Sequence, residues 1–310
     1  MADTSPPPPP GELRRRLQEQ AGLDLVTLKP TSTGESGTAF EVTDQAGAPG
    51  ILKIVPGAGA EAVRHLRALE PTLNRLRERG YPAPRFRTVG SLPGLVFWIQ
   101  DRLPGAPLDP DDPRQPGNPV ALARLMPELI RLNDAQAGLG TGPRTWPALI
   151  RETLTSGGHG YCLHATLEAD PRTRGLFAVV RQAGAAHGAA VPPGDDFVHY
   201  DFTLANMLSD GTAITGVIDI NPPVLAGDRA FDLATLLFYV YDHDELRGPL
   251  RSRLLELAGP GTACAYLAHM LLRQVDWSLR LHPEAAATER HLRLARLVAS
   301  DIGHGLARRA

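Results

Sequence analysis

Cysteine and lysine are both scarce in this chain of 310 residues. The two cysteines, Cys162 and Cys264, are too few for a disulfide framework, and their spacing does not fit a metal site. A reducing cytoplasm is therefore the expected location. Lys29 and Lys53 are the only lysines, so arginine supplies nearly all of the positive charge. A lysine kept in such a background indicates a need for a compact ammonium group.

Long apolar runs and a strong net charge are also lacking. The most apolar later segment, 231–241, contains Asp232 and is too short to span a bilayer. The proline-rich residues 1–12 lack the apolar run of a secretory signal, and we expect them to form a flexible tail. The net charge of −2 gives no reason to expect a nucleic-acid or membrane partner. We expect the chain to be a monomer or a homodimer.

Two parts of different character follow the tail. Residues 13–103 carry short strand-like segments joined by glycine turns, whereas residues 119–310 are mainly helical in pattern. Residues 104–118, dense in Pro, Gly and Asp, form the expected connection. The expected fold class is α+β: a bilobal fold with a small β-rich N-terminal lobe and a larger helical C-terminal lobe. The active site should lie in the cleft between them, where small-molecule sites usually lie.

Apolar periodicity predicts the individual helices of both parts. In the first part it predicts helices over 11–20 and 59–80, with Pro71 interrupting or restarting the second of these. In the second part the predicted helices are 119–138, 146–155, 171–188, 230–242, 247–258, 262–281 and 285–307. The exception is 196–220, which has the composition of short strands and turns.

This exceptional segment contains two carboxylates and an amide in apolar surroundings. Asp201 and Asn206 belong to 199-HYDFTLAN-206, and Asp219 ends a β-branched run. Burying a carboxylate without a partner is costly. Carboxylate and amide oxygens suit magnesium, which also takes phosphate oxygens, and Asp201 is able to accept a proton from a hydroxyl.

The stretch HYDFTLAN fits the H-x-D-x-x-x-x-N catalytic loop of kinases. With the following VIDI and GDRAFDLATLLF, residues 25–245 resemble the aminoglycoside phosphotransferase family, whose relatives include choline kinases and sugar kinases. The resemblance implies a kinase-like fold and phosphorylation of small-molecule hydroxyls by ATP or GTP. It implies Asp201 as catalytic base and Asn206 and Asp219 as magnesium ligands. His199 and Asp232 are expected to support the loop.

The first part is expected to supply the nucleotide site. By the same resemblance Ser36 and Gly37 form a loop over the phosphates, and Lys53 on a strand binds them. Glu70 is chosen over Glu61 as the partner of Lys53.

The resemblance also places an adenine-binding hinge at 98-WIQDRLPG-105, through the backbone of Asp101 and Leu103. Two departures from the family pattern are visible. Tyr200 stands where glycine is common, and no activation segment follows Asp219, which argues against a protein substrate.

The acceptor is expected to be an antibiotic, either an aminoglycoside or a cationic peptide of the tuberactinomycin kind, so that the enzyme confers resistance. A metabolic kinase for a sugar, amino alcohol or amino acid is the alternative, and an inactive nucleotide-binding module is a third hypothesis. An acidic lining would favour a cationic antibiotic. The candidate carboxylates for such a lining are Asp242, Asp244, Glu245 and Asp276.

Overall fold

The structure, a computed structural model, describes residues 7–31, 38–108, 119–142, 144–220 and 225–306. The chain divides into two compact units, residues 1–105 with 215–223, and residues 106–214 with 224–310. An antiparallel sheet dominates the first and helices the second, which confirms the α+β class. Residues 215–223 were expected in the second lobe but belong to the first unit, where Val217 N–H donates to Pro82 O at 2.9 Å.

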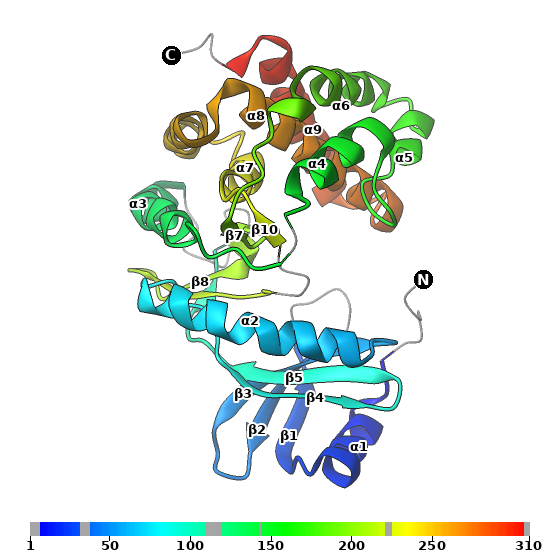
Figure 1. Ribbon diagram of the computed structural model, residues 1–310, viewed down its shortest axis with the longest axis vertical. Coiled ribbons are helices and arrows are strands. Elements are labelled where there is room, and N and C mark those ends of the chain that lie inside the picture. Colours follow the sequence, from blue (N-terminus) through cyan, green and yellow to red (C-terminus); the bar gives the residue numbers. More distant parts are fainter. Residues whose placement is uncertain (1–6, 32–37, 109–118, 143, 221–224, 307–310) are drawn as a thin grey trace. The chain divides into compact units, whose positions relative to one another are not determined.

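The first unit is built on a five-stranded antiparallel sheet, flanked by two helices (Figure 1). The strand order is β1-β2-β3-β5-β4. The strands are β1 (Leu25–Pro30), β2 (Ala39–Asp44), β3 (Pro49–Pro56), β4 (Phe86–Leu92) and β5 (Leu95–Asp101), and the helices are α1 (Pro10–Ala21) and α2 (Ala60–Glu78).

Successive residues of β5 face opposite sides of the sheet, as the period of a strand requires. Phe97 packs in a cluster with Leu13 and Leu17 of α1, whereas its neighbour Trp98 packs with Leu66 of α2. Helix α1 begins at Pro10, so the flexible tail expected over residues 1–12 includes residues that are helical in the structure. Proline is favoured in the first helical turn, where its missing N–H removes no hydrogen bond.

Helix α2 runs through Pro71 without the expected interruption. Its buried face continues on both sides of the proline, through Leu69 and Leu73, while Pro71 itself is exposed. Packing of this apolar face on the sheet holds the helix where a proline in isolation would break it.

The second unit is mainly helical. Its helices are α3 (Pro119–Ala135), α4 (Trp146–Ser156), α5 (His164–Ala169), α6 (Arg174–His187), α7 (Ala230–Tyr239), α8 (Asp244–Leu281) and α9 (Ala286–Gly303), with a short 3₁₀ turn η1 (Gly188–Ala190) after α6. Its strands are β6 (Ala106–Pro107), which pairs with β8 (Met207–Ser209), and β7 (Asp196–Val198), which pairs with β10 (Leu225–Gly227). Strand β9 (Ile214–Val217) follows β8, and the division between the units falls within it.

Helix α7 is the core of this unit, since every residue from Ala230 to Phe238 is buried. Helix α8 packs along it (Figure 1) and contains one non-helical residue, Gly259, with φ 69°. The two helices predicted over 247–258 and 262–281 are therefore real on either side of this kink. The short α5 was not predicted, because six residues are too few to show a period. None of the described helices is both long and apolar enough to cross a membrane.

Candidate active site

The catalytic-loop motif lies between β7 and β8 of the second unit. The chain leaves β7 at Val198 and forms a 3₁₀ turn, η2, over Leu204–Asn206 before β8 begins. This turn brings the predicted pair together: Asn206 Nδ2 donates to the carbonyl oxygen and to Oδ2 of Asp201, both at 2.9 Å.

The geometry of Asn206 leaves its side-chain oxygen for another ligand. Its amide nitrogen is used twice on Asp201, and no hydrogen bond to its Oδ1 occurs within the described part of the chain. The Asp201 side chain is 38% exposed, so its carboxylate is open to a substrate. An amide oxygen held beside an accessible carboxylate fits a magnesium–phosphate complex.

Asp232 anchors the loop from α7. The backbone N–H groups of His199 and Tyr200 donate to its carboxylate at 2.7 and 2.9 Å, and Gln136 Nε2 adds a third bond at 2.8 Å. Burial raises the pKa of Asp232 to about 6, although the nearby His199 and these donors oppose the shift. Asp232 thus has the supporting position expected for it. His199 Nδ1 accepts the N–H of Asp201 at 3.3 Å, which also supports the loop.

Tyr200 has a left-handed backbone conformation with φ 72°, which explains why glycine is common at this position of the motif. Its ring compensates by packing. It stacks on Phe231 at a centroid distance of 5.2 Å, and its hydroxyl lies 3.3 Å from that of Tyr161 and 3.4 Å from His269 Nε2. The aromatic core therefore holds the backbone that carries Asp201.

Arg273 of α8 is a site residue that the sequence reasoning missed. Its Nη2 donates to Asp201 Oδ1 at 2.8 Å, and its Nη1 donates to the carbonyl of Tyr200 at 2.5 Å. The signal in the sequence was an arginine within the mainly apolar segment 262–278. Sequence spacing gives no indication that α8 reaches the catalytic loop.

The second half of the predicted site lies in the first unit. Lys53 of β3 forms an ion pair with Asp219, and its ammonium lies 6.0 Å from the centre of the Trp98 ring. The side chain of Lys53 is 15% exposed and that of Asp219 is 40% exposed. Asp219 has φ 63°, a left-handed conformation that turns the chain directly after β9. Two residues expected at the phosphates are thus adjacent in the structure.

Glu70 has other partners than the one predicted. Its Oε1 accepts from Arg77 at 2.8 Å and its Oε2 from the N–H of Phe86 at 3.2 Å. The expected Lys53–Glu70 pair is therefore corrected within the described part of the chain: Lys53 pairs with Asp219, and Glu70 ties α2 to β4. The alternative, Glu61, is 74% exposed and lies 3.8 Å from His65.

The structure describes the residues expected to bind adenine but not those expected over the phosphates. The N–H of Asp101 donates to Arg85 O at 3.0 Å, and Leu103 lies two residues beyond β5. Their role in adenine binding stays a prediction. Ser36 and Gly37, expected over the phosphates, lie outside the described residues.

The carboxylates expected to line an acidic pocket are paired with arginines or lie at the surface. Asp242 is 3.1 Å from Arg293, Asp244 pairs with Arg247, and Glu245 is exposed in the first turn of α8. Buried Asp276 pairs with Arg280 at 2.8 Å and accepts from Thr166 at 2.6 Å. Asp242, Asp244 and Asp276 therefore each have an arginine partner in the structure. Binding of substrate by Asp242, Asp244 and Glu245 stays a prediction.

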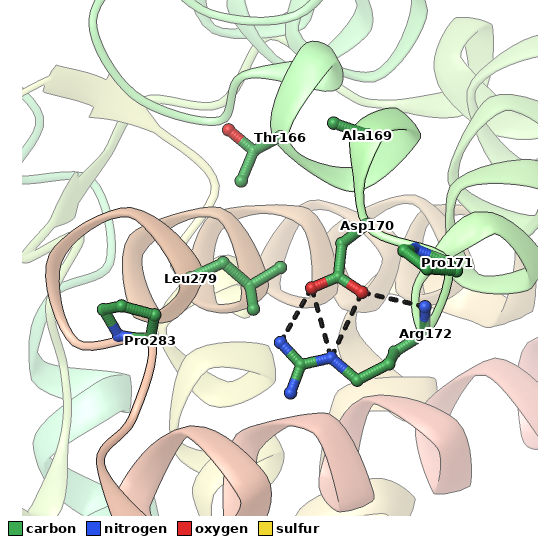
Figure 2. Close-up of a pocket in the computed structure, with 7 residues that line it drawn as sticks. All are labelled: Thr166, Ala169, Asp170, Pro171, Arg172, Leu279 and Pro283. Carbon is green, nitrogen blue, oxygen red and sulfur yellow. Dashed lines mark hydrogen bonds and ion pairs between the residues drawn. The ribbon is translucent and has the colours of Figure 1, made fainter.

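A surface hollow of about 580 Å³ opens on the second unit (Figure 2). Figure 2 shows the Arg172 guanidinium turned onto Asp170, with bonds of 2.7 and 3.1 Å, and this contact lowers the pKa of Asp170. The lining residues are Thr166, Ala169, Asp170, Pro171, Arg172, Leu279 and Pro283. Its charged groups satisfy each other, and none of the predicted site residues lines it.

In the part of the chain that the structure describes, carboxylates, imidazoles and thiolates alone do not form a metal site. No group of three or more such side chains is placed to hold an ion among the described residues. Asn206 of the second unit offers an amide oxygen and Asp219 of the first unit offers a carboxylate, and magnesium binding by either residue stays a prediction. That donor set is what magnesium usually takes in phosphoryl-transfer enzymes.

Residues 27–267 match the model of the phosphotransferase enzyme family. The chain therefore belongs to this family, and it is an enzyme that phosphorylates hydroxyl groups. The resemblance noted from the sequence is confirmed. A search of the curated proteins finds no match.

Several solved structures share the fold. A protein from Thermobifida fusca YX-ER1, proposed to be a fructosamine-3-kinase, is 20% identical, with a TM-score of 0.55 over 93% of this chain and 98% of that one. Macrolide 2'-phosphotransferase MphH from Brachybacterium faecium is 19% identical, with a TM-score of 0.56 over 92% and 97%. Aminoglycoside phosphotransferase APH(3'')-Id from Streptomyces rimosus, solved with ADP and streptomycin, is 17% identical, with a TM-score of 0.50 over 84% and 97%. At these identities the likeness shows the fold.

Proposed function

We propose that this chain is an ATP- and magnesium-dependent O-phosphotransferase that transfers the γ-phosphoryl group to a hydroxyl of a small molecule, with an antibiotic as the leading acceptor. The observation that carries the proposal is the catalytic loop, where Asp201 is accessible and is held by Asn206 and Arg273. A nucleotide donor is further supported by the neighbour solved with ADP. The availability of ATP favours the cytoplasm as its location.

The chemistry is a direct transfer. The acceptor hydroxyl oxygen forms a bond to the γ-phosphorus while the bond to the leaving ADP breaks, and the hydroxyl proton passes to the Asp201 carboxylate. Lys53, in the first unit, orients the phosphates through its ammonium group. Asn206 Oδ1 and the Asp219 carboxylate would hold magnesium, which supplies positive charge next to the phosphate oxygens when bound.

The acceptor class has two candidates. An antibiotic acceptor is supported by the macrolide and aminoglycoside phosphotransferases that share the fold. A fructosamine-type metabolic acceptor is supported by two further neighbours, proposed to be fructosamine-3-kinases, with TM-scores of 0.55 and 0.53. The arginine partner of Asp242 means that a cationic acceptor has no special advantage there.

A panel assay tests both the reaction and the acceptor. The purified protein is incubated with magnesium and either ATP or GTP. The acceptors are macrolides, aminoglycosides, a tuberactinomycin-type peptide, ketoamine sugars and simple amino alcohols. Mass spectrometry should show the gain of one phosphoryl group on one class, and Asp201→Asn should lose at least about 10² of the rate. Transfer at an undiminished rate in that variant, or no transfer to any member of the panel, would count against the proposal.

A further inference from the structure

Arg273 makes three contacts with two consecutive residues of the catalytic loop. Its guanidinium donates to the carboxylate of Asp201 at 2.8 Å and to the carbonyl of Tyr200 at 2.5 Å. Its central carbon also lies 4.7 Å from the centre of the Tyr200 ring. The planar fork of an arginine suits such a two-point contact, which an ammonium cannot reproduce.

These contacts restrict both the backbone and the side chain of the base. Tyr200 has the left-handed φ of 72°, so the peptide linking it to Asp201 sits in a conformation that needs external support. Arg273 binds the carbonyl of that peptide, while Asn206 binds the opposite carboxylate oxygen, Oδ2, at 2.9 Å. Asp201 is therefore held from both sides in one rotamer. Each carboxylate oxygen still has a lone pair for the acceptor hydroxyl.

We propose that Arg273 is the positioning residue of Asp201: by binding Asp201 Oδ1 and the Tyr200 carbonyl together, it sets the orientation in which the base receives the acceptor hydroxyl. The inference deepens the proposed function and rests on it for its kinetic part. Arg273 acts through Asp201 and transfers no proton itself. Its loss should lower kcat and leave nucleotide binding unchanged, because small displacements of a reacting group reduce rate much more than affinity.

The same helix provides a matched control. Arg280 stands seven residues after Arg273, about two helical turns along α8. It likewise binds one aspartate, Asp276 at 2.8 Å, and one backbone carbonyl, that of Gly160 at 3.3 Å. Removing Arg280 deletes an ion pair and a carbonyl contact of the same kind without touching the catalytic loop.

The experiment compares Arg273→Gln, Arg273→Lys and Arg280→Gln in the full chain. Hydrogen–deuterium exchange of peptides covering 197–207 reports the loop independently of any activity, and steady-state kinetics use the best acceptor of the panel. We expect Arg273→Gln to speed exchange in this segment by at least about tenfold and to lower kcat by about 10², with the KM for ATP within about threefold. Arg273→Lys should restore part of the slow exchange and part of kcat. Arg280→Gln should change neither the exchange of this segment nor kcat.

Equal exchange of the loop in Arg273→Gln and Arg280→Gln would overturn the inference. So would a faster-exchanging loop with an unchanged kcat, since Arg273 would then only anchor the loop. If Arg273→Gln unfolds the whole protein, exchange in the sheet of the first unit also becomes faster. In that case exchange of the loop and kcat are compared in Arg273→Lys instead, and these two measurements decide the inference. If the wild-type chain phosphorylates no acceptor, the proposed function fails, while the exchange data still decide whether Arg273 holds Asp201 in place.

Discussion

Lys53 of β3 and Asp219, which follows β9, form an ion pair within the first unit, although 166 residues separate them in the sequence. The pair depends on residues 215–223 joining this unit, which brings a predicted metal ligand against a predicted phosphate-binding lysine. In the proposed function, Lys53 contacts the phosphates and Asp219 contacts magnesium.

Replacement of Lys53 by Met should therefore impair nucleotide use. We expect the Kd for magnesium–ATP to rise at least about tenfold and kcat/KM to fall by about 10²–10³, because a fixed positive charge on the phosphates is lost. Titration calorimetry and initial rates measure the two effects. Lys29→Met removes the only other lysine, which is exposed on β1, and should change neither value. Equal behaviour of the two variants would exclude Lys53 from the phosphate site.

At Tyr200, glycine should be tolerated better than alanine. Both variants lose the ring that stacks on Phe231, at about 3–5 kcal/mol. Alanine must also hold the left-handed φ of 72°, which disfavours it by about 1 kcal/mol relative to glycine. We expect Tyr200→Gly to unfold at higher urea concentration than Tyr200→Ala, opposite to the order found in helices. The reverse order would show that the loop relaxes to an ordinary conformation once the ring is gone.

The bond between Asp232 and the loop should not survive replacement by asparagine. Three N–H donors, from His199, Tyr200 and Gln136, converge on its two oxygens. Asparagine offers one acceptor oxygen and places an NH₂ group against the remaining donors. We expect Asp232→Asn to lower the free energy of unfolding by about 2–3 kcal/mol and to reduce kcat. Denaturation curves that superimpose on the wild type would contradict this role.

His269 should make the protein less stable in acid. Burial, with a smaller effect of the nearby Arg273 charge, lowers the pKa of His269 to about 3, and its Nδ1 has no hydrogen-bond partner among the described residues. The unfolded chain binds a proton below pH ~6.5 and the folded chain does not, so this contribution to stability falls as pH drops from ~6.5 towards 3. At pH 5 the loss from this one group is roughly 2 kcal/mol.

His269→Leu removes that term. We expect the variant to gain about 2 kcal/mol relative to the wild type between pH 7.5 and pH 5, measured as the difference of two urea titrations. Taking the difference cancels the other buried groups, including His291, whose pKa burial lowers to about 4. A difference that does not change with pH would show that His269 is protonated as easily in the folded chain as in the unfolded one.

The parts of the site that follow from local sequence were predictable. Asp201 and Asn206 were both expected in the site; they stand five residues apart in one loop, and a single turn brings them into contact. Lys53 was expected on a strand, and the structure places it on β3. The strands and most helices followed from periods of two and 3.6 residues, which packing on one sheet or one helical core preserves.

The residues that were missed or misassigned depend on contacts between distant segments. Nothing in the neighbourhood of Glu70 showed that Arg77 and the N–H of Phe86 would bind it. Likewise, nothing near Asp242 in the sequence showed that Arg293 would pair with it. A charge pattern shows how many opposite charges exist, but only packing decides which of them meet.

By itself, the sequence determined the fold class, the family and the chemical groups of the catalytic loop, since these are set by residue type and short spacing. The tertiary structure decided the rest. In the folded chain, residues 215–223 belong to the first unit, and Tyr200 packs in an aromatic core that supports its left-handed backbone. Arg273 binds Asp201. The physical reason is that orienting a carboxylate requires donors from several directions, and only a folded chain brings helix α8, helix α7 and the loop after β7 to one point.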